Sequence, residues 1–105
     1  MAVSANFDLT GRTALVTGAS RGLGQIFGRA LAKAGADLVV TSRDVNALTP
    51  FCQEIEELGR RIVPLELDVR NQYSIERMCA AALEACDKID ILVNNAGCNI
   101  RKPAL

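Results

Sequence analysis

The chain has 105 residues, enough for one compact domain and too few for two. Its 12 basic side chains balance its 12 acidic ones, which argues against nucleic acid or an anionic membrane surface as a partner. No apolar run approaches the roughly 20 residues of a membrane-spanning helix, and residues 1–8 lack the basic and apolar blocks of a signal peptide. We therefore expect a cytoplasmic protein.

The strand pattern favours an α/β domain over residues 1–105. Hydrophobic residues make up 50% of the chain and aromatic residues only 4%, as in parallel strands of Val, Leu and Ile covered by helices. Apolar runs alternate with segments of helical period, which is typical of βαβ units. Four strands are predicted: Thr13 to Thr17, Asp37 to Thr41, Arg61 to Leu67 and Ile89 to Asn94. Pro64 lacks an N–H and favours an edge position for the third strand.

Two of the segments between these strands carry a clear helical stripe. In the first, the apolar members are Leu23, Ile26, Phe27, Ala30, Leu31 and Ala34, and Gly35 ends the helix. The same spacing returns in Ile75, Met78, Cys79, Ala82, Leu83 and Cys86. Asn71 or Ser74 can cap the start of this second helix. We expect both stripes to pack against the sheet.

Pro50 complicates the segment between the second and third strands. It lies six residues after the candidate cap Asp44, where its ring would disturb an established helix. Either that helix is kinked, or it begins at Thr49 with Pro50 as its first residue. Gly59 ends the helix, and its apolar side consists of Leu48, Phe51, Cys52, Ile55 and Leu58.

The four cysteines are Cys52, Cys79, Cys86 and Cys98. They contain no C-x-x-C pair and the chain has no histidine, so we expect no zinc site. Cys79 and Cys86 lie on the same side of a predicted helix, which favours reduced core thiols. An exposed Cys98 is the main exception we expect.

The first strand runs directly into the turn Thr17-Gly18-Ala19-Ser20-Arg21-Gly22-Leu23-Gly24 and then into a helix. The N–H groups that begin a helix attract anions, and glycines let a phosphate approach them closely. The turn does not fit G-x-G-x-x-G, because Phe27 stands where the third glycine or alanine belongs, and no G-K-[ST] follows as in a Walker A loop. A phosphate site is one interpretation, and a tight turn without a ligand is the other.

The spacing that does fit is T-G-x-x-x-G-x-G, with Thr17, Gly18, Gly22 and Gly24. It resembles the glycine turn of the short-chain dehydrogenase/reductase family. The segment Asn94-Asn95-Ala96-Gly97 is similar to the family's N-N-A-G segment, and Phe7 to Arg12 resembles the lead-in of many members. Gluconate 5-dehydrogenase-like and 3-oxoacyl-carrier-protein reductase-like proteins form the most similar branch. The resemblance implies the first half of a Rossmann-like doubly wound fold, with four parallel strands in the order 3-2-1-4 and helices on both faces.

The resemblance also implies coenzyme contacts at the strand ends. In the family, the Asp of a pair such as Asp68-Val69 binds the adenine amino group, and the Val backbone completes the pocket. The N-N-A-G backbone passes the adenosine ribose, and its asparagine steadies the sheet. An Asp after a strand is also a common helix cap, which is the alternative for Asp68. The carboxyl ends of the strands share one rim, so Gly18, Arg43, Asp68 and Asn95 can face one ligand.

The end of the second strand indicates which coenzyme is bound. An acidic residue there would bind the ribose hydroxyls of NAD and repel a 2′-phosphate, whereas this chain has Ser42 and Arg43. A guanidinium grips a phosphate through two hydrogen bonds, and Arg21 adds a second positive charge from the glycine turn. Asp44 comes one place too late for the ribose-binding acid and is interpreted as a cap. We expect NADP rather than NAD, and unpaired surface arginines are the alternative.

The full set of coenzyme-binding residues implied by the resemblance is Gly18, Ser20, Arg21, Gly22, Leu23, Gly24, Ser42, Arg43, Asp68, Val69, Asn95, Ala96 and Gly97. Family catalysis uses a Tyr-x-x-x-Lys pair with a Ser ahead of it. The only tyrosine, Tyr73, has Arg77 in place of the lysine and precedes the fourth strand. No catalytic residue is assigned, and we expect this chain to be inactive alone and to be part of a longer protein.

Two functions remain open. The first is an NADP-dependent oxidoreductase that moves a hydride between the coenzyme and a small carbonyl compound or secondary alcohol, as a homo-oligomer whose further part supplies the catalytic base. The second is a non-catalytic NADP(H)-binding module or a truncated remnant. Turnover by a longer product would separate them. Neither requires nucleic acid or a membrane as a partner.

Overall fold

The computed structural model describes residues 8–20 and 22–95. Its elements are β1 (Thr13–Thr17), α1 (Leu23–Lys33), β2 (Asp37–Ser42), the 3₁₀ turn η1 (Val45–Leu48), α2 (Thr49–Glu57), β3 (Ile62–Glu66), α3 (Gln72–Cys86) and β4 (Ile91–Asn94). The strands form one parallel sheet in the order β3-β2-β1-β4. The predicted topology is confirmed, as is the edge position of β3, which contains Pro64.

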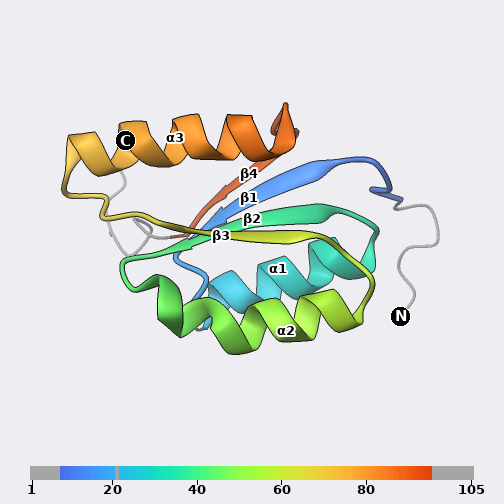
Figure 1. Cartoon of the computed structure of the whole chain (residues 1–105). Coiled ribbons are helices and arrows are strands. Elements are labelled where there is room, and N and C mark those ends of the chain that lie inside the picture. Colours follow the sequence, from blue (N-terminus) through green and yellow to red (C-terminus); the bar gives the residue numbers. More distant parts are fainter. Residues whose placement is uncertain (1–7, 21, 96–105) are drawn as a thin grey trace, which may run out of the picture.

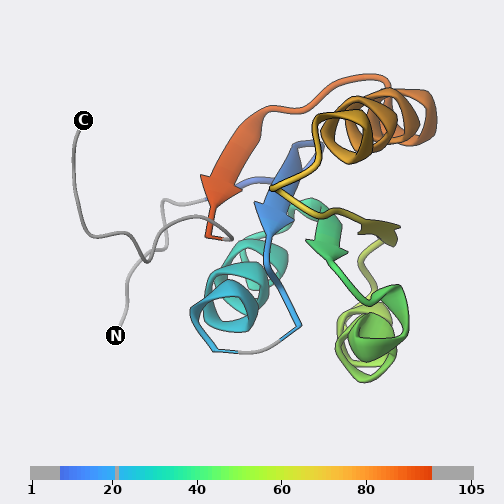
Figure 2. The same ribbon diagram turned by 90° about the vertical axis from the view of Figure 1, so that its left-hand side faces the viewer.

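Helices cover the two faces of the sheet unequally. Figures 1 and 2 show α1 and α2 side by side on one face and α3 on the other. The first layer buries the cluster of Ala14, Val16, Ala19, Ala32, Leu38, Val40, Leu48, Phe51, Ile55 and Ile62. The second layer buries the smaller cluster of Leu15, Val39, Leu67, Met78 and Ala82. Alternate residues of β1 and β2 therefore enter opposite clusters, as expected for central strands buried on both faces.

The strand predictions agree with the structure to within two residues. The bounds of β1 are as predicted, and β2 extends one residue further, to Ser42. One residue is lost from each end of the predicted third strand. The fourth strand begins at Ile91 rather than at Ile89. Asp90 replaces strand pairing there, because its carboxylate accepts the Thr13 N–H at 2.9 Å and its own N–H donates to the Thr13 carbonyl at 2.8 Å.

The predicted packing face of α1 is wrong for most of its members, although Leu31 is partly buried against the larger cluster. Its buried residues are Gly24, Gly28 and Ala32, whereas Leu23, Ile26 and Phe27 are exposed. The helix lies so close to the sheet and to α2 that a Cβ on residue 28 would come within 2.8 Å of the Phe51 ring. Small residues therefore occupy the contact row, and the bulky residues are turned away from it. A search for the most apolar stripe overlooks a contact row made of glycine and alanine.

In α3, which begins after the Asn71 cap as predicted, the predicted stripe is correct for Met78, Ala82 and Cys86 and wrong for its other members. Its buried row is Ser74, Met78 and Ala82, and the neighbouring row of Ile75, Cys79 and Leu83 is exposed. Cys79 is thus not a core thiol. Cys52 and Cys86 are free thiols that are partly buried and pack against the two clusters, and Cys98 lies outside the described residues.

The proline segment follows the second of the two predicted alternatives. Asp44 caps η1 by accepting the Asn46 N–H at 3.0 Å, and α2 then begins at Thr49 with Pro50 in its first turn. The predicted apolar side is correct for Leu48, Phe51 and Ile55, which are buried, and Cys52 is partly buried. Leu58, in contrast, is exposed.

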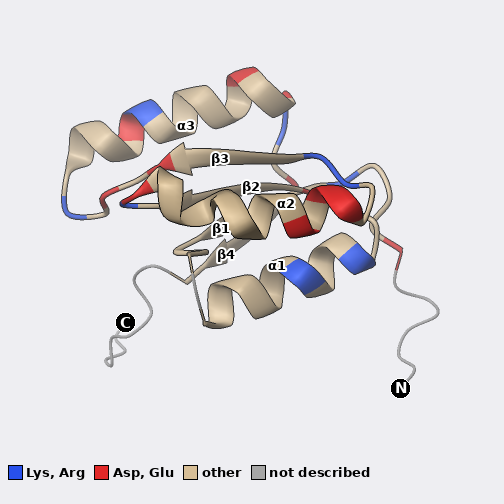
Figure 3. Ribbon diagram, turned by 60° about the horizontal axis from the view of Figure 1, so that its bottom comes forward, with Lys and Arg blue, Asp and Glu red and all other residues tan. Residues whose placement is uncertain are grey.

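An ion pair joins the two helices of the larger layer. Arg29 on α1 pairs with both carboxylate oxygens of Glu54 on α2, and its guanidinium carbon lies 5.6 Å from the centre of the Phe51 ring. In Figure 3 the basic segments in the C-terminal half of α1 lie next to the acidic C-terminal part of α2. The mutual hydrogen bond raises the pKa of Arg29 and lowers that of Glu54. Both side chains are about a third exposed or more, so the pair aligns the helices more than it stabilises them.

Candidate coenzyme-binding site

The predicted site residues gather where the four strands end. Because the strands are parallel, their carboxyl ends lie side by side at one end of the sheet, which we call the rim (Figure 2). The described members of the predicted set are Gly18, Ser20, Gly22, Leu23, Gly24, Ser42, Arg43, Asp68, Val69 and Asn95. Arg21, Ala96 and Gly97 lie outside the described residues.

The turn after β1 explains why glycine is needed at three positions. Gly18 and Gly22 have φ angles of 68° and 64°, in the region that side chains rarely adopt. Gly24 meets a different constraint, because a Cβ there would lie 2.4 Å from the carbonyl oxygen of Gly18. Gly22 is the N-cap of α1, and no side chain caps this helix. The start of α1 is therefore packed tightly against the turn. Its N-cap residue is a glycine, so no side chain covers the first N–H groups of the helix.

Hydrogen bonds hold the turn from the strands on either side of it. Thr41, buried at the end of β2, accepts the Gly18 N–H on its Oγ1 at 3.3 Å and the Ala19 N–H on its carbonyl oxygen at 2.9 Å. On the other side, Nδ2 of Asn95 donates to the Gly18 carbonyl oxygen at 3.0 Å. The turn is thus held by β2 on one side and by the residue that follows β4 on the other. Sequence reasoning missed Thr41, although a threonine that ends an otherwise apolar strand is a usable signal.

At the end of β4, Asn94 and Asn95 have different partners. The Thr17 hydroxyl donates to Oδ1 of Asn94 at 3.2 Å and approaches the Val93 carbonyl oxygen at 3.4 Å. Asn94 therefore joins β4 to β1, and Asn95 joins β4 to the glycine turn. A steadying role for this segment, implied by the family resemblance, agrees with these contacts.

The end of β2 presents Ser42 and an exposed Arg43. The Ser42 carbonyl oxygen accepts the Leu67 N–H at 2.9 Å, and Oγ of Ser42 accepts the Asp44 N–H at 3.3 Å. Asp44 itself caps η1, which confirms its interpretation as a cap. Its carboxylate is turned to that helix end, so Arg43 is the charged side chain that follows the strand directly.

Asp68 follows β3 in a tight turn. Its N–H donates to Oγ of Ser74 at 2.9 Å, and its Oδ1 accepts the backbone N–H of Arg70 at 3.0 Å. The Arg70 guanidinium also binds this carboxylate, with Nε 3.2 Å from Oδ1 and Nη2 3.4 Å from Oδ2. These bonds from Arg70, together with the nearby charge of Arg43, lower the pKa of Asp68 below its ordinary value. Asp68 is thus ionised at neutral pH. Sequence reasoning did not consider Arg70.

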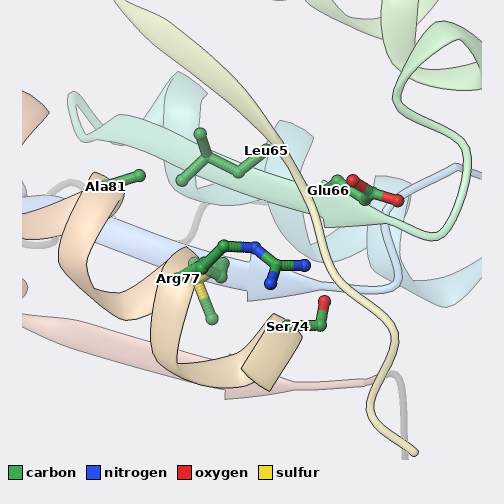
Figure 4. A pocket seen from close by; sticks show the side chains of 6 residues that line it. Leu65, Glu66, Ser74, Arg77 and Ala81 are labelled. Atoms are coloured by element: carbon green, nitrogen blue, oxygen red, sulfur yellow. The ribbon is translucent and has the colours of Figure 1, made fainter. Parts of the chain in front are cut away.

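A small open pocket lies behind this turn, between α3 and β3 (Figure 4). Its lining is Leu65, Glu66, Ser74, Arg77, Met78 and Ala81. Ser74 is shared between the pocket and the Asp68 turn, and the Arg77 side chain extends across the pocket from α3. Tyr73 is exposed in the first turn of α3 and does not line the pocket.

The described part of the chain has neither a candidate metal centre nor a membrane-spanning helix. No group of three or more His, Cys, Asp or Glu side chains there could hold a metal ion. None of the described helices is long and apolar enough to cross a membrane.

The fold and this rim define a nucleotide-binding α/β protein, and comparison with known proteins identifies its family. The model of the family described as short chain dehydrogenase matches residues 12–105. The chain belongs to the short-chain dehydrogenase family.

The similar curated proteins include a ketoacyl reductase and a gluconate 5-dehydrogenase. The chain is 41% identical over 92 residues to the ketoacyl reductase HetN of Nostoc sp., covering 88% of this chain and 32% of that protein. It is 38% identical over 97 residues to gluconate 5-dehydrogenase of Gluconobacter oxydans, covering 92% of this chain and 38% of that protein. The chain therefore spans about a third of the length of these relatives.

Solved structures give the same fold. A hydroxysteroid dehydrogenase from Escherichia coli matches with a TM-score of 0.83 and 34% identity over 93% of this chain and 42% of its own. The RhlG/NADP complex of Pseudomonas aeruginosa matches with a TM-score of 0.79 and 35% identity, covering 85% of this chain and 36% of that one. A short-chain dehydrogenase/reductase from Burkholderia phymatum in complex with NAD matches with a TM-score of 0.75 and 31% identity, covering 82% of this chain and 31% of that one. Similar proteins thus bind either nicotinamide coenzyme.

Proposed function

We propose that this chain is the coenzyme-binding part of an NADP-dependent oxidoreductase, which transfers a hydride between NADP(H) and a small carbonyl compound or secondary alcohol. The observation that carries the proposal is the convergence on one rim of the glycine turn, Arg43 and Asp68. Each comes from a different strand end. A purely structural glycine turn requires neither an exposed guanidinium nor an ionised carboxylate beside it.

The residues of the rim fit the parts of a dinucleotide. The backbone of the glycine turn would hold the pyrophosphate, because Gly18 and Gly22 have no Cβ that would keep a phosphate away from the start of α1. Asp68, ionised and oriented by its turn, would accept a hydrogen bond from the adenine amino group, and Val69 would line the pocket. The backbone of Asn95, Ala96 and Gly97 would lie beside the adenosine ribose. When bound, the nicotinamide supplies or accepts the hydride.

Preference for NADP rests on the end of β2. Ser42 gives no negative charge that would repel a 2′-phosphate, and Arg43 offers a guanidinium that can bind the phosphate through two hydrogen bonds. Arg21 would add charge from the turn. Asp44, the nearest carboxylate in sequence, is occupied as the cap of η1.

The catalytic base and the substrate pocket are assigned to parts of a longer protein. No residue of this chain is proposed as catalytic, and the chain by itself is predicted to be inactive. The chain covers only about a third of the length of these relatives, which supports this proposal. The names of these relatives point to keto and hydroxy compounds as the substrate class. A single domain over residues 1–105, a homo-oligomer and a cytoplasmic location stay predictions of the sequence.

Charge reversal at Arg43 tests the coenzyme preference. With Arg43→Asp we expect NADPH to bind at least about tenfold more weakly, because a charge-assisted pair with the phosphate is lost, and NADH to bind no more weakly. The measurement is a fluorescence titration of the folded protein with each coenzyme. Arg12→Asp is the matched control, since it changes the total charge equally at the opposite end of β1. An unchanged NADPH affinity in Arg43→Asp would show that Arg43 does not bind the phosphate.

A further inference from the structure

The carboxylate assigned to adenine already has a partner from this chain. The Arg70 guanidinium lies across both oxygens of Asp68, with contacts of 3.2 Å to Oδ1 and 3.4 Å to Oδ2. The two residues are separated by Val69 only, so no rearrangement of the fold is needed to bring them together. A ligand that approaches Asp68 from the rim therefore meets the Arg70 side chain at the same atoms.

The backbone and the side chain of Arg70 act differently on Asp68. The Arg70 N–H holds Oδ1 at 3.0 Å, and the Asn71 N–H closes the turn by donating to the Asp68 carbonyl oxygen at 2.9 Å. These backbone bonds orient the carboxylate whatever side chain stands at position 70. The guanidinium is not required for the turn, and its contact with Oδ2 is the longest of the set.

We infer that the Arg70 side chain competes with the adenine ring for the Asp68 carboxylate and so sets the coenzyme affinity of the site. This inference rests on the proposed function, because it takes Asp68 as the acceptor of the adenine amino group. Arg70 must swing away from Oδ2 when adenine binds. It can do so readily, since its side chain is 73% exposed and that of Asp68 is 33% exposed. Exposed pairs of this kind are worth little, so the competition is a modest and adjustable one.

Arg70 also carries a positive charge, which by itself would attract a coenzyme with several phosphates. Charge and competition act in opposite directions, and a suitable variant separates them. Arg70→Lys keeps the charge but cannot reproduce the two-point contact of a guanidinium with a carboxylate. If competition dominates, this variant binds coenzyme more tightly than the unchanged protein.

The experiment compares Arg70→Lys and Arg70→Gln with the unchanged protein, using NADPH and adenosine 2′,5′-bisphosphate as probes. Arg70→Lys should tighten the binding of both probes by about two- to fivefold, the size expected when an exposed two-point ion pair is weakened. Nicotinamide mononucleotide, which lacks adenine, should bind the unchanged protein and Arg70→Lys equally, because both have a positive charge at position 70. In an Asp68→Asn background the effect of Arg70→Lys should shrink, because the coupling between the two positions is removed. The pKa of Asp68 should rise toward its ordinary value in Arg70→Gln, because its main hydrogen-bonding partner is lost.

Two results would overturn the inference while leaving the proposed function intact. One is NADPH binding to the unchanged protein and to Arg70→Lys with the same affinity. The other is weaker binding to Arg70→Lys, which would make the guanidinium a direct contact of the coenzyme. If NADPH bound to neither protein, the proposed function would fail, and the inference would fail with it.

Discussion

The half of the sheet around β3 and the half around β4 differ in how completely helices cover them; we call these halves the β3 side and the β4 side. On the side of β3, Phe51 of α2 and Met78 of α3 are buried on opposite faces. On the side of β4, the register partners Leu15 and Leu92 point to the same face of the sheet, yet Leu15 is 8% exposed and Leu92 is 63% exposed. Apolar strand residues alone do not make a core, because a helix must lie over them.

Both helix layers expose apolar residues toward this same β4 side. On α3, Arg77 and Ala81 line the pocket over β3, so Ile75 and Leu83 occupy the opposite flank. On α1, Arg29 faces α2, and the exposed row opposite to it contains Leu23 and Phe27. Apolar surface thus flanks the β4 edge on both faces of the sheet. The β3 edge carries Pro64 instead, which discourages further pairing.

The largest effect should come from a cavity on the β3 side. Phe51→Ala removes a fully buried ring that packs against Gly28 and under Arg29, and we expect it to lower the free energy of unfolding by about 3–5 kcal/mol. Phe27→Ala is the matched control on the exposed row of α1, with a change within about 0.5 kcal/mol. Urea denaturation followed by circular dichroism measures both. Equal losses would show that the two sides are equally packed.

A smaller effect is expected where the two sides meet, at the glycine turn. Gly24→Ala would push a methyl group against the Gly18 carbonyl oxygen, which is backbone and cannot move aside alone, so we expect a loss of about 1–3 kcal/mol. NADPH binding should weaken with it, because the turn would open. In Gly28→Ala the methyl group meets the Phe51 ring instead, and coenzyme affinity should stay unchanged. Thermal unfolding and NADPH titration of both variants test the distinction. Equal coenzyme affinities in the two variants would contradict it.

The smallest effect on stability is expected at the β4 edge. Leu92→Lys places a charge on an exposed strand position and should change the free energy of unfolding by no more than about 0.5 kcal/mol. It should reduce self-association of the 105-residue chain, because it breaks up exposed apolar surface on β4, which is an edge strand of the described sheet. Analytical ultracentrifugation over a concentration series measures this. A stability loss comparable to that of Phe51→Ala would mean that Leu92 is covered in solution.

The site was predictable to the extent that it depends on strand ends. The glycine turn, Arg43 and Asp68 lie on one rim because parallel order puts the carboxyl ends together. Thr41 and Arg70 were not predicted, because their roles depend on distances across the rim and within one turn. Neither belongs to a motif, so no spacing pattern points to them.

The sequence by itself determined the local features of this protein. Apolar runs specified the strands, Asn71 and Asp44 specified two caps, and Pro50 indicated where α2 begins. Each is decided by neighbours in the chain. Only the tertiary structure decided which helix rows are buried, because the row of glycine and alanine on α1 becomes a contact row only when a sheet lies close enough to exclude larger side chains. Hydrophobicity measures what a residue gains from burial, whereas the space between two elements decides which residue is buried.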